Sequence, residues 1–131
     1  MAAIDELDAA AVQGKITLLP GHDVELTSVT FCIQDEDHTM GNALRYMLMK
    51  DARVEFCGYT IPHPSESKVH IRVQMVENTV SAVQAFAEAL SNLYGLLETV
   101  QEEYTASLTD GQFERTETKP IPVSLRKEFS G

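Results

Sequence analysis

The residues best able to do chemistry form a short run in the first third of the chain. Asp35, Glu36 and Asp37 precede His38, a set that could hold a metal ion or act as an acid–base pair. Adjacent residues in a loop rarely converge on one ion, and carboxylates also suit the start of a helix, where the dipole favours negative charge. The run is therefore interpreted as the start of a helix.

Two pairs of cysteine and histidine are the other candidates for catalysis. Cys32 with His38, or Cys57 with His63, could supply a thiol nucleophile and its base. Both cysteines lie in segments that read as strands, where cysteine is most often a small apolar filler. No glycine-rich elbow, oxyanion turn, phosphate loop or zinc-ligand spacing accompanies them. We therefore expect no catalytic residue, no cofactor and no metal.

The charge of the chain limits its partners. The 131 residues carry a formal net charge of −10, and residues 1–37 hold eight acidic side chains against Lys15 alone. Nucleic-acid binding needs a basic footprint, so direct contact with nucleic acid is not expected. No apolar run approaches the roughly 20 residues of a membrane span, and the acidic start predicts neither a secretory signal nor a transit peptide. These features predict a soluble intracellular protein.

Four segments have the pattern of strands. They are residues 16–19, 24–34, 54–61 and 69–75. Apolar and polar residues alternate most clearly in the second and fourth of them. In the third, Val54, Phe56 and Gly58 are expected to share one face. Two prolines, Pro62 and Pro64, predict a stiff loop between the last two strands.

The first predicted helix covers residues 38–51, with Asp37 or Thr39 as its cap. Its apolar face consists of Met40, Leu44, Met47 and Leu48. Gly41 in its first turn costs up to about 1 kcal/mol relative to alanine, a cost that makes sense if another group packs closely there. The opposite side carries a polar row, His38, Asn42 and Arg45. This row is either an ordinary solvated face or a small docking surface.

The second predicted helix starts at Asn78 or Thr79 and continues to about Tyr104. Its apolar residues follow alternating spacings of three and four, which is the heptad pattern of a packing seam. They are Val83, Phe86, Leu90, Leu93, Leu97, Val100 and Tyr104. The seam either packs on its own sheet or is shared with another chain. Its length of about 32 Å exceeds the need of a small sheet, which favours sharing.

These elements predict an α+β fold of two layers in the order ββαββα. A four-stranded, mostly antiparallel sheet carries two helices, the second of them long. The expected organisation is an acidic N-terminal tail over residues 1–14, a folded domain over residues 15–105 and a polar C-terminal tail over residues 106–131. The excess of apolar surface on the second helix predicts an oligomer.

Two stretches of the chain resemble a known family. Residues 37–45, which read D-H-T-M-G-N-A-L-R, resemble the alpha motif of the RNA polymerase alpha family, D-H-T-L-G-N-x-L-R, with Met40 as the one departure. Residues 54–66 are similar to the small eukaryotic alpha-like subunit. Their Glu-Phe-Cys-Gly-Tyr core, residues 55–59, resembles the form shared by RNA polymerases I and III. The resemblance extends over about residues 24–104.

The resemblance implies a non-catalytic subunit with a dimerisation domain. Its expected partner is the larger alpha-like subunit, with which it would form a heterodimer that gathers the second-largest and largest catalytic subunits of RNA polymerases I and III. The apolar faces of both helices would meet the larger alpha-like subunit. The resemblance also places Arg45, and with it the row of His38 and Asn42, at a contact with a large subunit. The implied location is the nucleus, including the nucleolus.

Two alternatives remain open at this point. One is a homodimeric interaction module of the same fold outside transcription. The other is a small enzyme of the same shape, as in the pterin dehydratases, which would need a cluster of histidines. Here His38, His63 and His70 fall on separate predicted elements.

Overall fold

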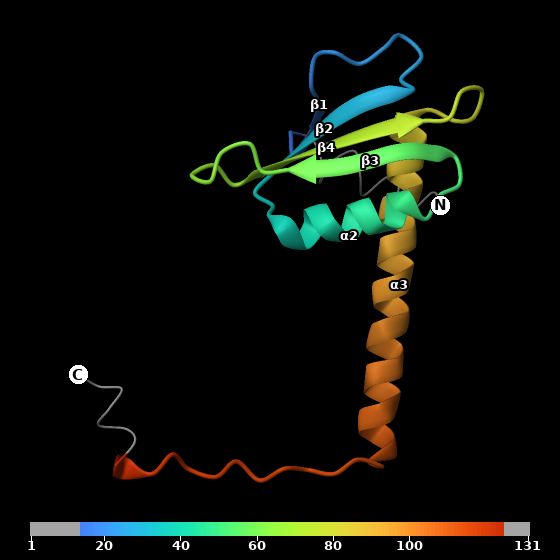
Figure 1. Ribbon diagram of the computed structural model, residues 1–131. Helices are drawn as coiled ribbons and strands as arrows, with labels where there is room; N and C mark the ends of the chain where they lie inside the picture. Colours follow the sequence, from blue (N-terminus) through green and yellow to red (C-terminus); the bar gives the residue numbers. More distant parts are fainter. Residues whose placement is uncertain (1–13, 125–131) are drawn as a thin grey trace. The chain divides into compact units, whose positions relative to one another are not determined.

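The structure is a computed structural model and describes residues 14–124. Its elements are β1 (Ile16–Leu18), β2 (Ser28–Gln34), α2 (His38–Met49), β3 (Val54–Thr60), β4 (Lys68–Met75) and α3 (Ala82–Asp110) (Figure 1). The chain divides after Thr99 into two compact units. The first contains the sheet, α2 and the start of α3, and the second contains the end of α3 and the residues after it. Nearly all of the predicted acidic N-terminal tail lies outside the described residues.

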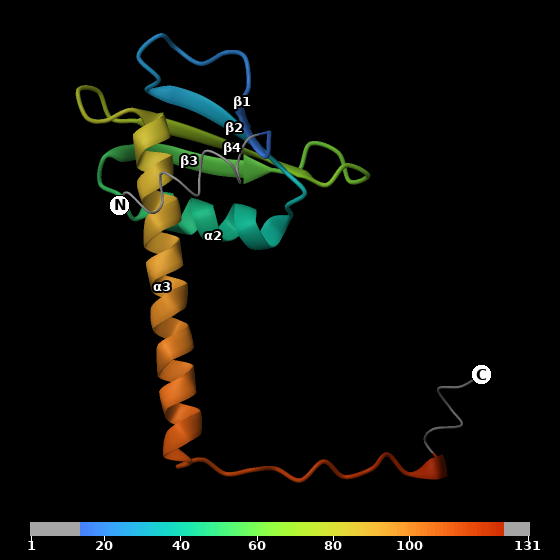
Figure 2. The same ribbon diagram turned by 180° about the vertical axis from the view of Figure 1, so that it is seen from behind.

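The four strands form one antiparallel sheet in the order β1-β2-β4-β3. The strand that precedes α2 therefore pairs with the strand that leads into α3. Figure 1 shows the strands in front of α3, and Figure 2 shows α3 in front of the strands, so this helix crosses one face of the sheet. The predicted two-layer ββαββα fold with a long second helix is confirmed.

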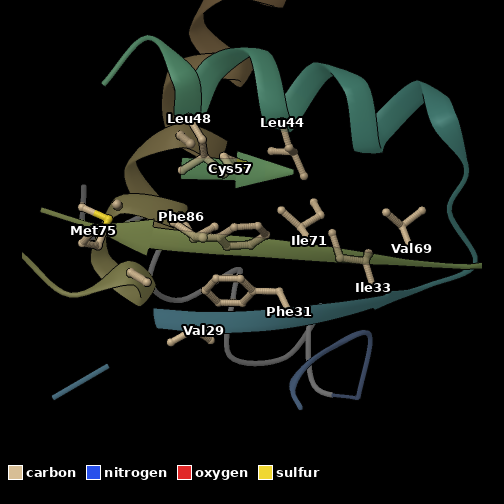
Figure 3. Close-up of a cluster of buried hydrophobic side chains, with 14 of the residues drawn as sticks. Val29, Phe31, Ile33, Leu44, Leu48, Cys57, Val69, Ile71, Met75 and Phe86 are labelled. Carbon is tan, nitrogen blue, oxygen red and sulfur yellow. The ribbon is translucent and has the colours of Figure 1, made fainter. Parts of the chain in front are cut away.

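The core lies between this face of the sheet and the two helices. Successive strand residues face opposite sides, so alternate residues of β2 and β4 enter it. α2 adds Leu44 and Leu48, and α3 adds Phe86, whose ring stacks on Phe31 with 4.1 Å between centroids. Figure 3 shows these side chains as one cluster. Each large side chain buried in this way contributes about 1.5–3 kcal/mol to folding.

The second strand is shorter than predicted, because residues 24–27 form a turn before it. The Asp23 carboxylate accepts hydrogen bonds from the Thr27 hydroxyl and from the Ser28 N–H, the latter at 3.0 Å. These two bonds hold the pKa of Asp23 below its ordinary value. Leu26 has a φ of 56°, a left-handed conformation that interrupts an extended strand.

The face predicted for the third strand is wrong for Val54, which does not share a face with Phe56 and Gly58. A β-bulge between Val54 and Phe56 shifts the register, so that Val54 pairs with Met75 and Phe56 pairs with Gln74. An extra residue in one strand moves the side chains after it to the other face. Val54 consequently packs toward the core, whereas Phe56 is 48% exposed and the next residue, Cys57, takes the buried position.

The long helix begins later than predicted. Asn78 has a φ of 59°, and the Thr79 hydroxyl donates to the carbonyl of Val76, so neither residue caps α3. The Ser81 hydroxyl instead accepts the N–H of Gln84 at 3.1 Å, which is the geometry of a helix N-cap.

The long helix also ends later than predicted. It continues past Tyr104 to Asp110, so the predicted start of the polar tail at residue 106 lies within the helix. Gly111, with a φ of 69°, follows it as the left-handed glycine typical of helix C-termini. No helix or strand follows through residue 122 of the described chain.

Candidate protein–protein interface

The start of α2 is fixed by its cap and by one close contact. Asp37 caps the helix as predicted, since its carboxylate accepts the Thr39 N–H at 2.9 Å. This bond with the Thr39 backbone holds the pKa of Asp37 below its ordinary value. The close packing expected at Gly41 is confirmed, because a methyl group there would lie 2.6 Å from Cδ2 of Tyr59. Gly41 therefore allows α2 to contact β3 directly.

The polar row of α2 lies beside a surface hollow. His38 Nδ1 and the Tyr59 hydroxyl are hydrogen-bonded at 3.0 Å, and Arg45 Nη2 donates to Asn42 Oδ1 at 2.9 Å. His38, Arg45, Tyr59 and Pro64 border a hollow of about 740 Å³ between α2 and the end of β3. β3 thus holds His38 through Tyr59, a contact that sequence reasoning missed, whereas Arg45 is oriented by Asn42 of the same helix. A guanidinium oriented by one side-chain hydrogen bond keeps further N–H donors for a carboxylate or a carbonyl from another protein.

The apolar residues predicted at the partner interface differ in exposure. Buried in the core of this chain are Leu44, Leu48, Phe86 and Leu93. Packed against that core and partly buried are Met40, Met47 and Leu90. Exposed are Val83, Leu97, Val100 and Tyr104. The first group holds the sheet and helices together, so the surface open to a partner is narrower than the sequence pattern predicted.

Three of the four exposed residues lie on the later turns of α3, whereas Val83 lies in its first turn. Leu97 is 59% exposed, Val100 55% and Tyr104 65%. Leu97 belongs to the first compact unit, and Val100 and Tyr104 belong to the second. Each is a large apolar side chain that buries less than half of its surface against its own chain. An apolar row of this kind is typical of helices that pair with a second protein.

A second hollow lies between α2 and the start of α3. Met47, Asp51, Ala85, Ala89 and Asn92 border a volume of about 330 Å³. The two alanines lack the bulk to fill the space beside Met47. A side chain from a partner helix could enter there, as knobs enter holes when helices pack. Sequence reasoning missed this arrangement, because it depends on how the two helices lie against each other.

A charged cluster fixes α3 against the turn that follows α2. Arg53 binds Asp51 at 2.8 Å and also pairs with Glu88 of α3. The hydrogen bonds from Arg53 hold the pKa values of Asp51 and Glu88 below their ordinary range, and the pKa of Arg53 is raised, first by Asp51 and then by Glu88. Arg53 and Glu88 are 35 positions apart, so no local pattern in the sequence indicates the pair.

The candidate catalytic pairs lie on different elements, Cys32 on β2 with His38 on α2, and Cys57 on β3 with His63 in the loop after it. Cys57 is 5% exposed, and burial raises the pKa of its thiol to about 11, which leaves the thiol neutral and weakly nucleophilic near pH 7. His38 lies on α2, His63 in the loop after β3 and His70 on β4. Within residues 14–124, no three histidine, cysteine or acidic side chains are grouped to hold a metal ion. No helix in this range has the length and apolarity to cross a membrane.

Comparison with known protein families accounts for this architecture. A sequence profile of the RNA polymerase Rpb3/Rpb11 dimerisation domain matches residues 28–103, more than half of the chain. The chain belongs to this family. The matched range of the Rpb3/Rpb11 domain runs from β2 well into α3 and includes every residue of the two predicted interfaces except Tyr104.

Three relatives bear one name, DNA-directed RNA polymerases I and III subunit RPAC2. The Schizosaccharomyces pombe protein is 53% identical over 94 residues, which cover 72% of this chain and 74% of the relative. The Saccharomyces cerevisiae protein is 49% identical over 82 residues, 63% of this chain and 57% of the relative, so less than two thirds of that protein is matched. The Danio rerio protein is 45% identical over 82 residues, 63% of this chain and 72% of the relative.

A solved structure has a fold similar to that of this chain. DNA-directed RNA polymerase subunit L from Thermoplasma acidophilum superposes with a TM-score of 0.60, covering 78% of this chain and 96% of that one. The sequences are 19% identical, so this likeness concerns the fold alone.

Proposed function

We propose that this chain is the small alpha-like assembly subunit of DNA-directed RNA polymerases I and III. The observation that carries the proposal is its 53% identity to the S. pombe subunit of those two polymerases. In this role the chain forms a heterodimer with the larger alpha-like subunit, and the pair gathers the second-largest and largest catalytic subunits. Membership of the Rpb3/Rpb11 dimerisation family supports the first of these steps.

The chain acts in this proposal through protein contacts and has no active site of its own. Its net charge of −10 opposes direct binding of nucleic acid and suits a subunit that other proteins hold in place. It requires no cofactor. Its place of action is the nucleus, including the nucleolus, because the relatives are named as subunits of RNA polymerases I and III.

The exposed and partly buried apolar residues of the two helices form the proposed surface for the larger alpha-like subunit. Val83, Leu97, Val100 and Tyr104 supply its exposed side chains, and Met40, Met47 and Leu90 are partly buried against the core. Leu44, Leu48, Phe86 and Leu93 belong to the core itself. An obligate interface of this type typically covers about 2,000 Å² or more.

The pairing is tested with Leu97→Asp in a chain co-expressed with the larger alpha-like subunit. An unpaired carboxylate at the centre of an apolar contact costs several kcal/mol, so the heterodimer should be lost. Thr99→Asp is the matched control, because it adds the same charge two residues away, where the hydroxyl bonds the carbonyl of Gly95 on the helix itself. Co-purification and sedimentation measure the result. Equal heterodimer yield from both variants would refute the pairing surface, and a stable homodimer would favour a module outside transcription.

The polar row of His38, Asn42 and Arg45 is the proposed contact with the second-largest subunit. The hollow beside the row supports this assignment, because a side chain from another protein can reach Arg45 there. Arg45→Glu should leave the heterodimer intact and weaken capture of the second-largest subunit. Losing one hydrogen-bonded charge at an interface costs about 2 to 5 kcal/mol.

Stepwise reconstitution separates the two steps. Heterodimer formation is measured first, and binding of the second-largest subunit to the purified pair is measured next. Arg45→Lys should restore binding in part, since it keeps the charge but loses the planar fork. If the heterodimer with Arg45→Glu captured the second-largest subunit normally, the row would be an ordinary solvated face.

A further inference from the structure

The face of the sheet opposite the helices carries mainly polar and basic side chains. The register places Thr30 opposite Arg72 and Cys32 opposite His70 on β2 and β4, and it places Gly58 and Thr60 beside Arg72 and His70 on β3. These residues alternate with the core residues of the same strands, so they lie on the far side from α2 and α3. We call this side the open face.

An aromatic side chain lies flat across part of the open face. The Phe56 ring covers Gly58, since a methyl group at Gly58 would lie 3.1 Å from its Cζ atom. Beside it, Phe56, Thr60, His70 and Arg72 border a hollow of about 330 Å³. The bulge in β3 is what turns Phe56 to this face and leaves it 48% exposed. The open face thus combines an exposed apolar ring with an adjacent depression.

The open face carries basic side chains although the chain as a whole is acidic. Its paired strand positions hold Lys68 and Arg72 and no carboxylate, and Glu55, the unpaired residue of the bulge, is the acidic residue within β3. Lys68 is already paired with Glu66 at 2.7 Å. Arg72 donates to the Thr30 hydroxyl at 3.2 Å and has no carboxylate partner within residues 14–124. Arg72 is therefore a cation that has no acidic partner among the described residues and that borders the hollow.

We propose that the open face binds an acidic, extended peptide segment of another protein. A carboxylate of that segment pairs with Arg72, and an apolar side chain of the same segment packs on Phe56. Charge complementarity selects the acidic partner, because a cationic face on a chain of net charge −10 attracts anions locally. Nucleic acid is disfavoured because its closely spaced phosphates need a broad basic footprint, whereas a short peptide needs to place only one carboxylate at Arg72. The surface lies on the other side of the sheet from the helices, so the proposal does not depend on the pairing described above.

The test measures peptide binding to the full chain purified with its larger partner. The probe is a synthetic ten-residue peptide that alternates glutamate with phenylalanine, and its control has lysine in place of glutamate. The glutamate peptide should bind and the lysine peptide should not. Arg72→Glu should weaken binding at least tenfold, whereas Arg72→Lys should weaken it less. Lys119→Glu, the same charge change on an exposed residue outside the sheet, should have no effect.

A second measurement identifies the source of the segment. A photo-reactive p-benzoylphenylalanine replaces Thr60, which borders the hollow, in the assembled complex. Irradiation should cross-link it to an acidic stretch of another subunit, and Arg72→Glu should reduce that cross-link by the same factor as peptide binding. Cross-links to nucleic acid or to residues 1–13 of this chain would overturn the proposal. So would equal peptide binding by Arg72→Glu and the unmodified chain, or no binding at millimolar peptide. Failure of the chain to pair with the larger subunit would count against the proposed function and not against peptide binding by the open face.

Discussion

Gly41 lies in the first turn of α2 with the Tyr59 ring against it. Replacing a helical glycine by alanine normally stabilises by up to about 1 kcal/mol. Here the new methyl group would meet ring carbons at 2.6 and 2.9 Å, so Gly41→Ala should destabilise the fold by about 1–3 kcal/mol. The urea midpoint of the chain co-purified with the larger alpha-like subunit, measured at one fixed protein concentration, checks this.

Gly95 provides the control for that prediction. It lies within α3, and a methyl group there would meet nothing within 4 Å. Gly95→Ala should therefore raise the urea midpoint, because alanine stabilises a helix by up to about 1 kcal/mol relative to glycine. A Gly41→Ala chain that is more stable than the unmodified one would show that Tyr59 moves aside at no cost.

The two cysteines should behave as buried residues and not as nucleophiles. Cys32 is 4% exposed and Cys57 is 5% exposed, and burial raises the pKa of Cys57 to about 11. Iodoacetamide at pH 7 should therefore label the folded chain at least a hundredfold more slowly than the urea-unfolded chain. Cys57→Ala should keep pairing and assembly and lose only packing energy, of order 1 kcal/mol. Rapid labelling of the folded chain, or loss of function by a correctly paired Cys57→Ala chain, would reopen an enzymatic interpretation.

At the level of elements, Arg53 links α3 to the turn after α2 by pairing with Asp51 in that turn and with Glu88 on α3. The pKa values of Asp51 and Glu88 lie below their ordinary range in the folded chain because Arg53 donates to both. Folding therefore favours the ionised carboxylates. Their contribution to stability is present above the ordinary pKa values of about 4 and is lost as the pH falls through the lower folded values.

Arg53→Met should remove part of this acid sensitivity. The thermal midpoint of the unmodified chain should fall between about pH 5 and pH 3, and the variant should show a lower midpoint at pH 7 and a smaller fall. Lys15→Met is the control, because it removes a different ion pair, with Glu36, at 3.0 Å. Parallel curves for the unmodified and Arg53→Met chains would show that the cluster does not stabilise the fold.

The elements also show what local sequence can indicate. Alternation in β2 and β4, the Asp37 cap and the two apolar helix faces were predictable, because each depends on residues a few positions apart. Gly111 marked the true end of α3 in the sequence, although the polar residues before it favoured an earlier end. The bulge at Val54 and Phe56 was not predictable, since the register of β3 depends on its pairing with β4.

The predicted interface residues also separate into what local sequence indicates and what only the tertiary structure shows. Spacing alone placed Phe86, Leu93 and Leu97 on one helix face, but it could not tell which turns meet the sheet. Phe86 stacks on Phe31 and Leu93 is 8% exposed, whereas Leu97 is 59% exposed. That difference arises because Phe86 and Leu93 pack in the core and Leu97 does not, which is a property of the assembled fold. The contact of Tyr59 with Gly41 and the hollow beside Arg45 depend on tertiary structure in the same way.

For the molecule as a whole, the exposed apolar residues of α3 predict behaviour without a partner. Leu96, Leu97, Val100, Tyr104 and Leu108 are each at least 46% exposed. Apolar surface of this extent favours association. The chain produced alone should self-associate or precipitate at micromolar concentration, and co-expression with the larger alpha-like subunit should yield a soluble pair. Sedimentation velocity checks this, and a stable monodisperse monomer would contradict it.

The two edges of the sheet decide what kind of assembly that self-association produces. β1 has three residues, and β3 carries the bulge next to Phe56. A short edge and a bulged edge are poor templates for another strand, so neighbouring copies cannot readily extend the sheet. Copies of the unpaired chain should therefore gather through their helices as amorphous particles without the cross-β repeat of amyloid. Such particles should leave thioflavin T fluorescence unchanged and should dissolve when the larger subunit is added.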